Sequence, residues 1–219
     1  MSTTENRGTV RRGVRGVRAL LALGAVGAFT LAGMGTAQAQ GTGAVAGATG
    51  QGGGARADAP GETRYPASVT AAQALRTELS RRDGAGVRAR VVCYRTHVAD
   101  FGWLGTACNG APAGSAGYHK AVEAVEIATS DTGGVCANAH LADHGWQGTH
   151  CAGNGASVTV GTTGQSRRME ALWIQVGTGP LAAQGHVQDI GWTATQYGNP
   201  VVVGTTGQHR RLEAISVWV

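Results

Sequence analysis

The chain has 219 residues, of which 37 are glycine and only 14% are charged, and its net charge is +5. Five arginines and one acidic residue fall within the first 39 positions, so the remainder carries 13 basic and 12 acidic residues. A nearly neutral remainder without a lysine or arginine stripe argues against a nucleic-acid-binding protein.

Residues 1–39 are predicted to be a secretory signal peptide. Five arginines precede a short apolar run over 19–32, and Ala37-Gln38-Ala39 fits a small-residue cleavage site. The run is shorter than the roughly 20 residues that a membrane-spanning helix needs. We therefore expect a secreted, extracellular product with no membrane anchor after cleavage, while the choice between the Sec and Tat export routes stays open.

Two segments connect this signal to the rest of the chain. Residues 40–66 are rich in glycine and alanine with almost nothing to bury, which is typical of a flexible tether. Residues 67–86 are expected to form a short helical or irregular lead-in. Thr70 and Gln73 have the spacing of a capping box, Leu75 and Leu79 share a helical face, and Gly84 can end the helix.

Residues 87–219 contain one motif written three times, in copies spanning 87–129, 130–176 and 177–219. A histidine, an aspartate and a tryptophan recur at constant spacing, and a glycine-rich loop and a Glu-Ala pair follow in every copy. A period of this size indicates a supersecondary unit that cannot bury its apolar face alone. The recurring residues are His97, Asp100, Trp103 and Glu123; His140, Asp143, Trp146 and Glu170; and His186, Asp189, Trp192 and Glu213.

Each copy has the pattern of short strands joined by an Asp-Gly turn, and helical periodicity is absent. Three copies are too few for a propeller, and an open stack would need distinct capping repeats. We therefore predict an all-β fold in which the three repeats close about a pseudo-three-fold axis. A β-prism is preferred, and a β-trefoil is the alternative.

The four cysteines follow the same repeat. Cys93 lies ten residues before its tryptophan and Cys108 five after it, and Cys136 and Cys151 hold the same two offsets. The third copy has Ala182 and Tyr197 there, so both members of the pair are missing together, as a bonded pair predicts. We therefore predict the disulfides Cys93–Cys108 and Cys136–Cys151, because the spacing is unlike that of a zinc knuckle.

The combination of His-Val-x-Asp-x-Gly-Trp, Gly-Thr-Thr-Gly-Gln and Arg-Leu-Glu-Ala-Ile resembles the clostridial hydrophobic repeats named for their tryptophan, the ChW repeats. These repeats also occur in secreted proteins of actinobacteria. The resemblance covers residues 91–219 and is weaker in the first copy, where Ser115–Tyr118 replaces the polar loop. It implies an extracellular, non-enzymatic module associated with adhesion or with binding polysaccharide or protein at cell surfaces. It supplies no catalytic residue.

The best polar ligand site in the sequence is the pair of loops 161–165 and 204–208 with the arginines that follow them. Backbone amides, hydroxyls, carboxamides and guanidinium groups together suit a polyhydroxylated or anionic glycan. A solvated turn is the alternative interpretation. Trp173 and Trp218 are candidates for a contact surface. The candidate loop residues are Thr162, Thr163, Gln165, Arg167, Thr205, Thr206, Gln208 and Arg210.

The recurring residues themselves are interpreted as structural. The three repeat tryptophans are expected in the core with their indole N–H groups bonded to backbone, rather than as sugar-stacking platforms. Each histidine is expected to bond backbone or its own repeat's aspartate, rather than to converge with the others on a metal. The glutamates are expected to pair with Arg168 and Arg211, because glycoside hydrolysis needs two carboxylates in one cleft.

The sequence thus predicts a secreted, non-enzymatic surface-binding or adhesion module that recognises polysaccharide or cell-wall glycan through repeated sites, with no cofactor and no metal. A protein-interaction or self-associating extracellular structural component is the alternative, and a wall-polymer hydrolase is less favoured. The identity of the ligand and the oligomeric state stay open.

Overall fold

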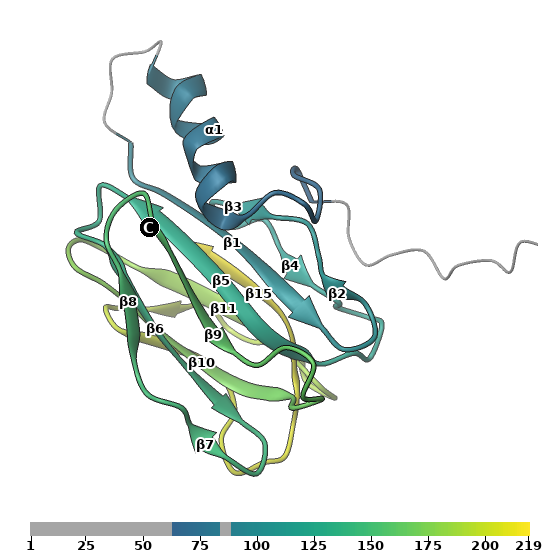
Figure 1. Ribbon diagram of the computed structural model, residues 1–219. Coiled ribbons are helices and arrows are strands. Elements are labelled where there is room, and N and C mark those ends of the chain that lie inside the picture. The colour runs from purple at the N-terminus through teal and green to yellow at the C-terminus, as the bar shows by residue number, and fades with distance from the viewer. Residues whose placement is uncertain (1–62, 84–88) are drawn as a thin grey trace, which may run out of the picture. The chain divides into compact units, whose positions relative to one another are not determined.

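A computed structural model describes residues 63–83 and 89–219, and it confirms the predicted all-β class (Figure 1). The described residues form one helix and fifteen strands, which are arranged in three five-stranded antiparallel sheets. The predicted signal peptide (1–39) and most of the predicted tether (40–62) lie outside the described residues, and so does the segment 84–88 with Gly84.

Each sheet is built around the two long strands of one repeat. The sheets are numbered after the repeats that supply those strands. Sheet 1 contains β1 (Val91–Val98), β2 (Gly102–Trp103), β3 (Ala107–Cys108), β5 (Val122–Ser130) and β9 (Ser157–Gly161). Sheet 2 contains β6 (Val135–Leu141), β7 (Gly145–Trp146), β8 (His150–Ala152), β10 (Met169–Val176) and β14 (Val201–Gly204). Sheet 3 contains β11 (Ala182–Val187), β12 (Gly191–Trp192), β13 (Gln196–Tyr197), β15 (Leu212–Trp218) and β4 (Ala113–Gly114).

The repeats close into a ring because each lends a strand to another repeat's sheet. Strand β9 of repeat 2 pairs with β5 in sheet 1, and β14 of repeat 3 pairs with β10 in sheet 2. The cycle is completed when β4 of repeat 1 pairs with β15 in sheet 3. Three separate sheets around a shared interior correspond to the predicted prism, whereas a trefoil requires strands closed into one barrel. The pseudo-three-fold closure is thus confirmed.

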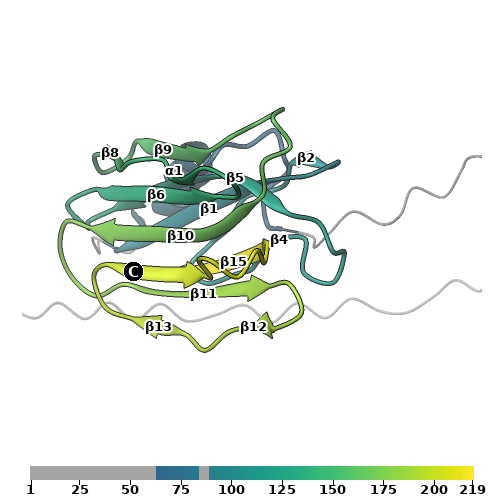
Figure 2. The same cartoon turned by 90° about the horizontal axis from the view of Figure 1, so that it is seen from below.

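The inner faces of the three sheets meet in a single apolar core (Figure 2). Alternate residues along each long strand point inward, as the two-residue period of a strand requires. Ile127 from sheet 1, Leu172 from sheet 2 and Ile215 from sheet 3 are fully buried there. Tyr94 also belongs to this core, and its hydroxyl accepts a hydrogen bond from the amide of Val217 at the edge of sheet 3, at 2.9 Å.

The hairpins place the cysteines as the spacing predicted. Cys93 is directly opposite Cys108, and Cys136 is directly opposite Cys151, and both pairs are bonded. In repeat 3 the same register places Ala182 opposite Tyr197, without a bond. The two strands of repeat 3 therefore stay paired at this position although both cysteines are replaced.

The lead-in forms helix α1 (Ala71–Asp83), which packs against the outer face of sheet 1 (Figure 1). Its capping box is present: the amide of Gln73 donates to the Thr70 hydroxyl at 3.3 Å, and the amide of Thr70 donates to the Gln73 carboxamide at 2.9 Å. The ordered contacts begin before residue 67, because Tyr65 forms a β-bridge with Thr106 and is 7% exposed.

Candidate functional site

Each repeat holds its tryptophan against a histidine, and that histidine contacts a buried glutamate. In repeat 1 the Nδ1 atom of His97 lies 3.0 Å from Oε2 of Glu123, which is 6% exposed. The corresponding distances are 3.4 Å for His140 and Glu170 and 2.9 Å for His186 and Glu213. In repeats 2 and 3 the two groups are in contact, but Nδ1 and the carboxylate are not aligned as a hydrogen bond.

The expected arginine partners of the glutamates are present, but the expected aspartate partners of the histidines are not. Arg168 contacts Glu170 at 3.0 Å and Arg211 contacts Glu213 at 2.8 Å. The aspartates instead occupy the turns, where their backbones have positive φ values of 60–69°. Asp100 pairs with Lys120 at 2.7 Å and Asp189 with Arg210 at 3.3 Å; Asp143 adopts the same backbone conformation.

The expectation that the repeat tryptophans are core residues is wrong. Trp146 is 43% exposed and Trp192 is 39% exposed, and Trp103 is half-buried. The reason is positional: each tryptophan lies on a two-residue strand beyond the turn, outside the inner face, and its ring meets the edge of the histidine ring. The ring centroids are 5.2–5.5 Å apart with interplanar angles of 80–83°.

The glycine loops lie across the glutamates of a different repeat. The amide of Thr162 donates to the carbonyl of Glu123 at 2.9 Å, and the amide of Thr205 donates to that of Glu170 at 2.9 Å. Gly204, just before this contact, has a φ of 94°, and a Cβ built on it would lie 2.2 Å from the Glu170 carbonyl oxygen. The loop glycine is therefore required where two repeats join.

The structure divides the eight loop candidates into two groups. The hydroxyls of Thr162 and Thr205 are buried and lack a hydrogen-bond partner among the described residues, so they do not face a ligand at the surface. Arg210 is held by the carbonyl of Gln188 and the carboxylate of Asp189. The exposed candidates are Thr163, Gln165, Arg167, Thr206 and Gln208.

A polar hollow of about 450 Å³ lies where the repeat 2 loop meets repeat 1. Its lining includes His97, Asp100 and Glu123 from repeat 1 and Ser166 and Arg168 from repeat 2. The charged groups here already contact one another or their neighbours. The hollow therefore has the character of a structural junction.

A second hollow, of about 340 Å³, lies on the outer face of sheet 2 and combines two tryptophans. It is lined by Asn138, Trp146, Thr149 and Trp173. Asn138 and Trp173 are directly opposite in the ladder between β6 and β10, so their side chains stand on the same face. We call these four residues the tryptophan cleft. Trp218, the other candidate for a contact surface, is half-buried and lies against the backbone of Gly110.

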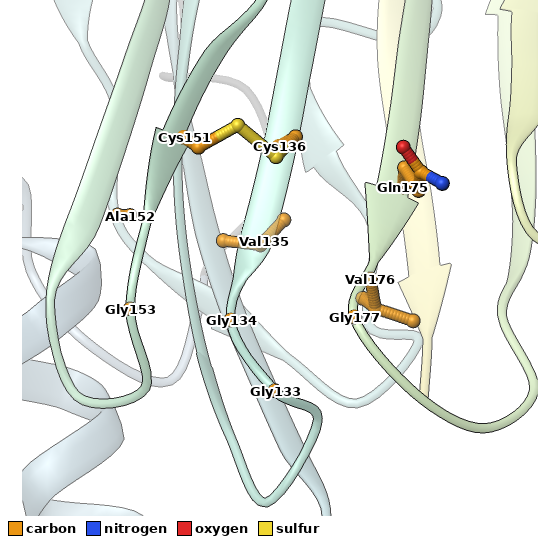
Figure 3. Close-up of a pocket in the computed structure, with 10 residues that line it drawn as sticks. All are labelled: Gly133, Gly134, Val135, Cys136, Cys151, Ala152, Gly153, Gln175, Val176 and Gly177. Carbon is orange, nitrogen blue, oxygen red and sulfur yellow. A yellow bond between two sulfur atoms is a disulfide. The ribbon is translucent and has the colours of Figure 1, made fainter.

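The face continues from the tryptophan cleft into a glycine-lined groove of about 420 Å³ (Figure 3). The groove runs beside the Cys136–Cys151 disulfide and beneath Gln175, whose side chain is exposed. Cys136 and Gln175 are opposite each other and lie two residues from Asn138 and Trp173 along their strands. Both hollows therefore belong to the outer face of sheet 2.

Three titratable groups, Tyr65, Glu78 and Tyr94, have pKa values that are shifted by their surroundings, and burial raises the pKa of Tyr65. Burial opposes ionisation of Glu78 on α1, but hydrogen bonds from the Tyr65 hydroxyl and the Arg64 guanidinium lower its pKa overall. Burial raises the pKa of Tyr94 in the core. None of the three groups lines either hollow on sheet 2.

No group of three or more histidine, cysteine, aspartate or glutamate side chains among residues 63–83 and 89–219 is arranged to hold a metal ion. Within the same residues, no helix is long and apolar enough to cross a membrane. The three glutamates that recur with the motif, Glu123, Glu170 and Glu213, are distributed one to a repeat, each against its own histidine.

The fold and its surface define a class: a disulfide-bonded, three-repeat β-module whose repeats display tryptophan on the outside. Disulfides of this kind are typical of oxidising, extracellular environments. The family model described as Clostridial hydrophobic W, or ChW, matches residues 97–131, 140–177 and 186–219, and the chain belongs to this family of repeat proteins. No curated protein and no solved structure matches the chain.

The tryptophan cleft was only partly accessible to sequence reasoning. Trp173 was identified as a contact candidate, but Asn138 and Thr149 were missed, and Trp146 was assigned to the core. One signal could have found Asn138: it stands two residues before the repeat histidine, so strand alternation places both side chains on one face.

Proposed function

We propose that the protein is a secreted, non-enzymatic module that binds glycan at a cell surface or in a cell wall. The coarser part of this statement, a repeat-containing surface module, follows from the family. The recognition of carbohydrate is our proposal. It concerns the outer faces of the sheets, since the inner faces are used to form the core.

The observation that carries the proposal is the display of rigid tryptophan at the surface. A side chain such as Trp146 would bury well over 100 Å² in a core, yet it is 43% exposed and fixed by the His140 ring and the buried Glu170 behind it. An indole face fixed in this way loses little conformational entropy when a ligand stacks on it. Surface tryptophans beside amide and hydroxyl groups suit the apolar face and the polar rim of a sugar ring.

The absence of enzymatic activity is also part of the proposal. Glycoside hydrolysis needs two carboxylates that share one cleft. Each of the repeat glutamates Glu123, Glu170 and Glu213 is instead engaged by one histidine, and Glu170 and Glu213 are additionally engaged by an arginine. The other buried glutamate of the repeats, Glu126, is paired with Arg95. These carboxylates are therefore engaged in structural contacts.

Self-association is a second candidate, and repeat 3 supplies the observation that favours it. Ile190 is 50% exposed, Trp192 is 39% exposed and Tyr197 is 82% exposed, all within one short stretch of the chain. Exposed apolar groups gathered in this way are typical of protein contact surfaces.

A binding screen separates the two candidates. The protein, purified from an oxidising export system, is tested for retention on insoluble cellulose, chitin and peptidoglycan and on a glycan array, and its mass is measured by sedimentation. We expect retention on polysaccharide by a monomer. If no glycan is bound and oligomers form that Trp192→Ala dissolves, self-association is the function.

A further inference from the structure

We propose that the tryptophan cleft of repeat 2 is the glycan-binding site and that it takes an uncharged pyranose ring, so that each chain binds one glycan chain. This inference rests on the proposed function and departs from the three equivalent sites that the repeats suggest. It is carried by a comparison of the positions of Asn138, Trp146 and Trp173 in the three repeats.

The lining of the cleft identifies the chemistry of the ligand. Two indoles provide apolar faces. The Asn138 carboxamide oxygen accepts a hydrogen bond from the Gly148 amide at 3.1 Å, which directs its NH2 group and leaves this group and the Thr149 hydroxyl as the polar groups at the rim. None of the four lining residues is charged. An uncharged ring with an apolar face and a hydroxylated edge therefore complements the cleft, whereas a uronate or a sulfated sugar would find no counter-charge in it.

The same positions in repeat 1 are filled. Arg95 stands where repeat 2 has Asn138, and Glu126 where it has Trp173, and these two form an ion pair. The Arg95 guanidinium lies over the Trp103 ring, 4.5 Å from its centroid, and donates to the carbonyl of Ala67 in the lead-in at 2.9 Å. The Trp103 face is thus occupied by the protein's own cation.

Repeat 3 retains the first tryptophan but lacks the second. Gln184 and Ser216 occupy the positions of Asn138 and Trp173, and the Gln184 amide donates to the carbonyl of Thr193 at 2.6 Å. Ser216 is 4% exposed and presents no aromatic surface. A ring stacked on Trp192 would contact one indole only, so binding there is weaker.

We expect the bound glycan to extend from the tryptophan cleft along β6 into the groove beside the disulfide. The positions of Cys136, Asn138 and His140 succeed one another on the same face of β6, which places the ends of this row about 13 Å apart at the usual rise of a strand. A linear glycan whose ring stacks in the cleft can continue over the glycine-lined groove, where backbone atoms are accessible. In repeat 1 the corresponding surface around Cys93 is covered by Leu75 of α1.

The test uses the five tryptophans as built-in reporters. Each indole N–H gives one signal in a two-dimensional ¹⁵N–¹H spectrum, and tryptophan-to-phenylalanine variants assign the five. Cellotetraose and chitotetraose serve as uncharged probes, and a tetrasaccharide of galacturonate serves as the charged comparator. We expect the signals of Trp146 and Trp173 to shift with the uncharged probes while those of Trp103, Trp192 and Trp218 do not.

Calorimetry on matched variants measures the contribution of each indole. Trp146→Ala and Trp173→Ala should each weaken binding by about thirtyfold, and Trp146→Tyr should recover most of the loss because it restores an aromatic face. Trp192→Ala is the control, since it removes an equivalent tryptophan from its histidine without touching the cleft. We expect it to change the dissociation constant less than twofold, and we expect one site per chain. Thermal unfolding verifies that all variants are folded.

The outcomes separate this inference from the proposed function. Binding with shifts at Trp192, three sites per chain, or preference for the galacturonate probe would overturn the single uncharged-sugar site and leave glycan binding intact. Failure of every glycan in the screen would overturn both.

Discussion

The outer faces of sheets 1 and 2 have the same strand order around a long hairpin, a disulfide at the same register and a tryptophan held by a histidine. They differ in what covers them. Sheet 1 carries α1 and an ion pair over its tryptophan, whereas sheet 2 exposes the tryptophan cleft and the glycine-lined groove. The repeats therefore share one arrangement of strands, disulfide and tryptophan, and a few substitutions determine which sheet has an uncovered outer face.

The difference depends on two positions of the second long strand. Ala128, buried under the helix in sheet 1, corresponds to the exposed Gln175 in sheet 2, and Glu126 corresponds to Trp173. The small side chain of Ala128 allows α1 to pack on sheet 1. Gln175 and Trp173 stand at the corresponding part of sheet 2, where this face is open to other molecules. Four experiments test this comparison, beginning with the frame that both sheets share.

The largest effect is expected at the junction between repeats. Gly204→Ala should lower the free energy of unfolding by about 3 kcal/mol or more, because its Cβ would collide with the backbone of Glu170 at a positive φ. Gly207→Ala, in the same loop at a φ of 70° with nothing within 4 Å, should cost about 1 kcal/mol. Urea unfolding measures the loss of free energy in both variants. Equal losses would contradict the explanation that Gly204 is required by the close contact of β14 with β10.

Uncovering sheet 1 should have the next largest effect. Leu75 is fully buried against Val91, Cys93 and Ala128, so Leu75→Ala should cost about 3 kcal/mol. Leu79 is only partly buried on the same helix, and its replacement by alanine should cost about 1 kcal/mol. Hydrogen exchange should locate the loss in α1 and the outer face of sheet 1. A uniform loss over all three sheets would be inconsistent with a separately docked helix.

The two disulfides should differ in how fast they are reduced. Cys93 is fully buried under α1, whereas Cys151 is exposed at the edge of the glycine-lined groove. Because thiol exchange requires access to a sulfur, dithiothreitol should open Cys136–Cys151 about tenfold faster. Timed alkylation and peptide mass mapping measure this ratio. Leu75→Ala should reduce the difference by exposing Cys93, and an unchanged ratio in that variant would show that α1 is not the barrier.

The smallest effect is expected from pH. Hydrogen bonds from Tyr65 and Arg64 lower the pKa of Glu78 in the folded state. The stabilisation is therefore present above the ordinary glutamate pKa and is lost as the pH falls through the lowered value. Urea unfolding at pH 7 and at pH 3 should show a loss in the parent protein that is smaller in Glu78→Gln. An identical loss in both would assign the acid sensitivity to other carboxylates.

The repeat boundaries and the disulfides could be predicted because they depend only on the spacing of residues along the sequence. The offsets of Cys93 and Cys108 from Trp103 recur in repeat 2, and the joint replacement in repeat 3 identified the bonded pairs. The pairing of β9 and β14 with the sheets of other repeats could not be predicted. Each has the alternation of a strand, but this pattern does not indicate which sheet the strand joins.

The candidate site was harder to predict than the fold for a related reason. Periodicity separates the two faces of a strand but does not say whether an outer face is covered. The assignment of Trp146 to the core failed because its recurrence was equated with burial, whereas the repeated requirement is the contact between the indole and His140. Whether Trp103 or Trp146 is free depends on Arg95 and the lead-in, which the motif does not include.

The strand that repeat 1 contributes to sheet 3 has a consequence for how the polypeptide matures. Ala113 pairs with Ile215, so β4 cannot join its sheet until the closing strand of repeat 3 has been synthesised. Long-range pairing of this kind folds slowly. Pairing of β15 with β4 is therefore the step that closes the ring of sheets, and it has to wait for the final hairpin of repeat 3.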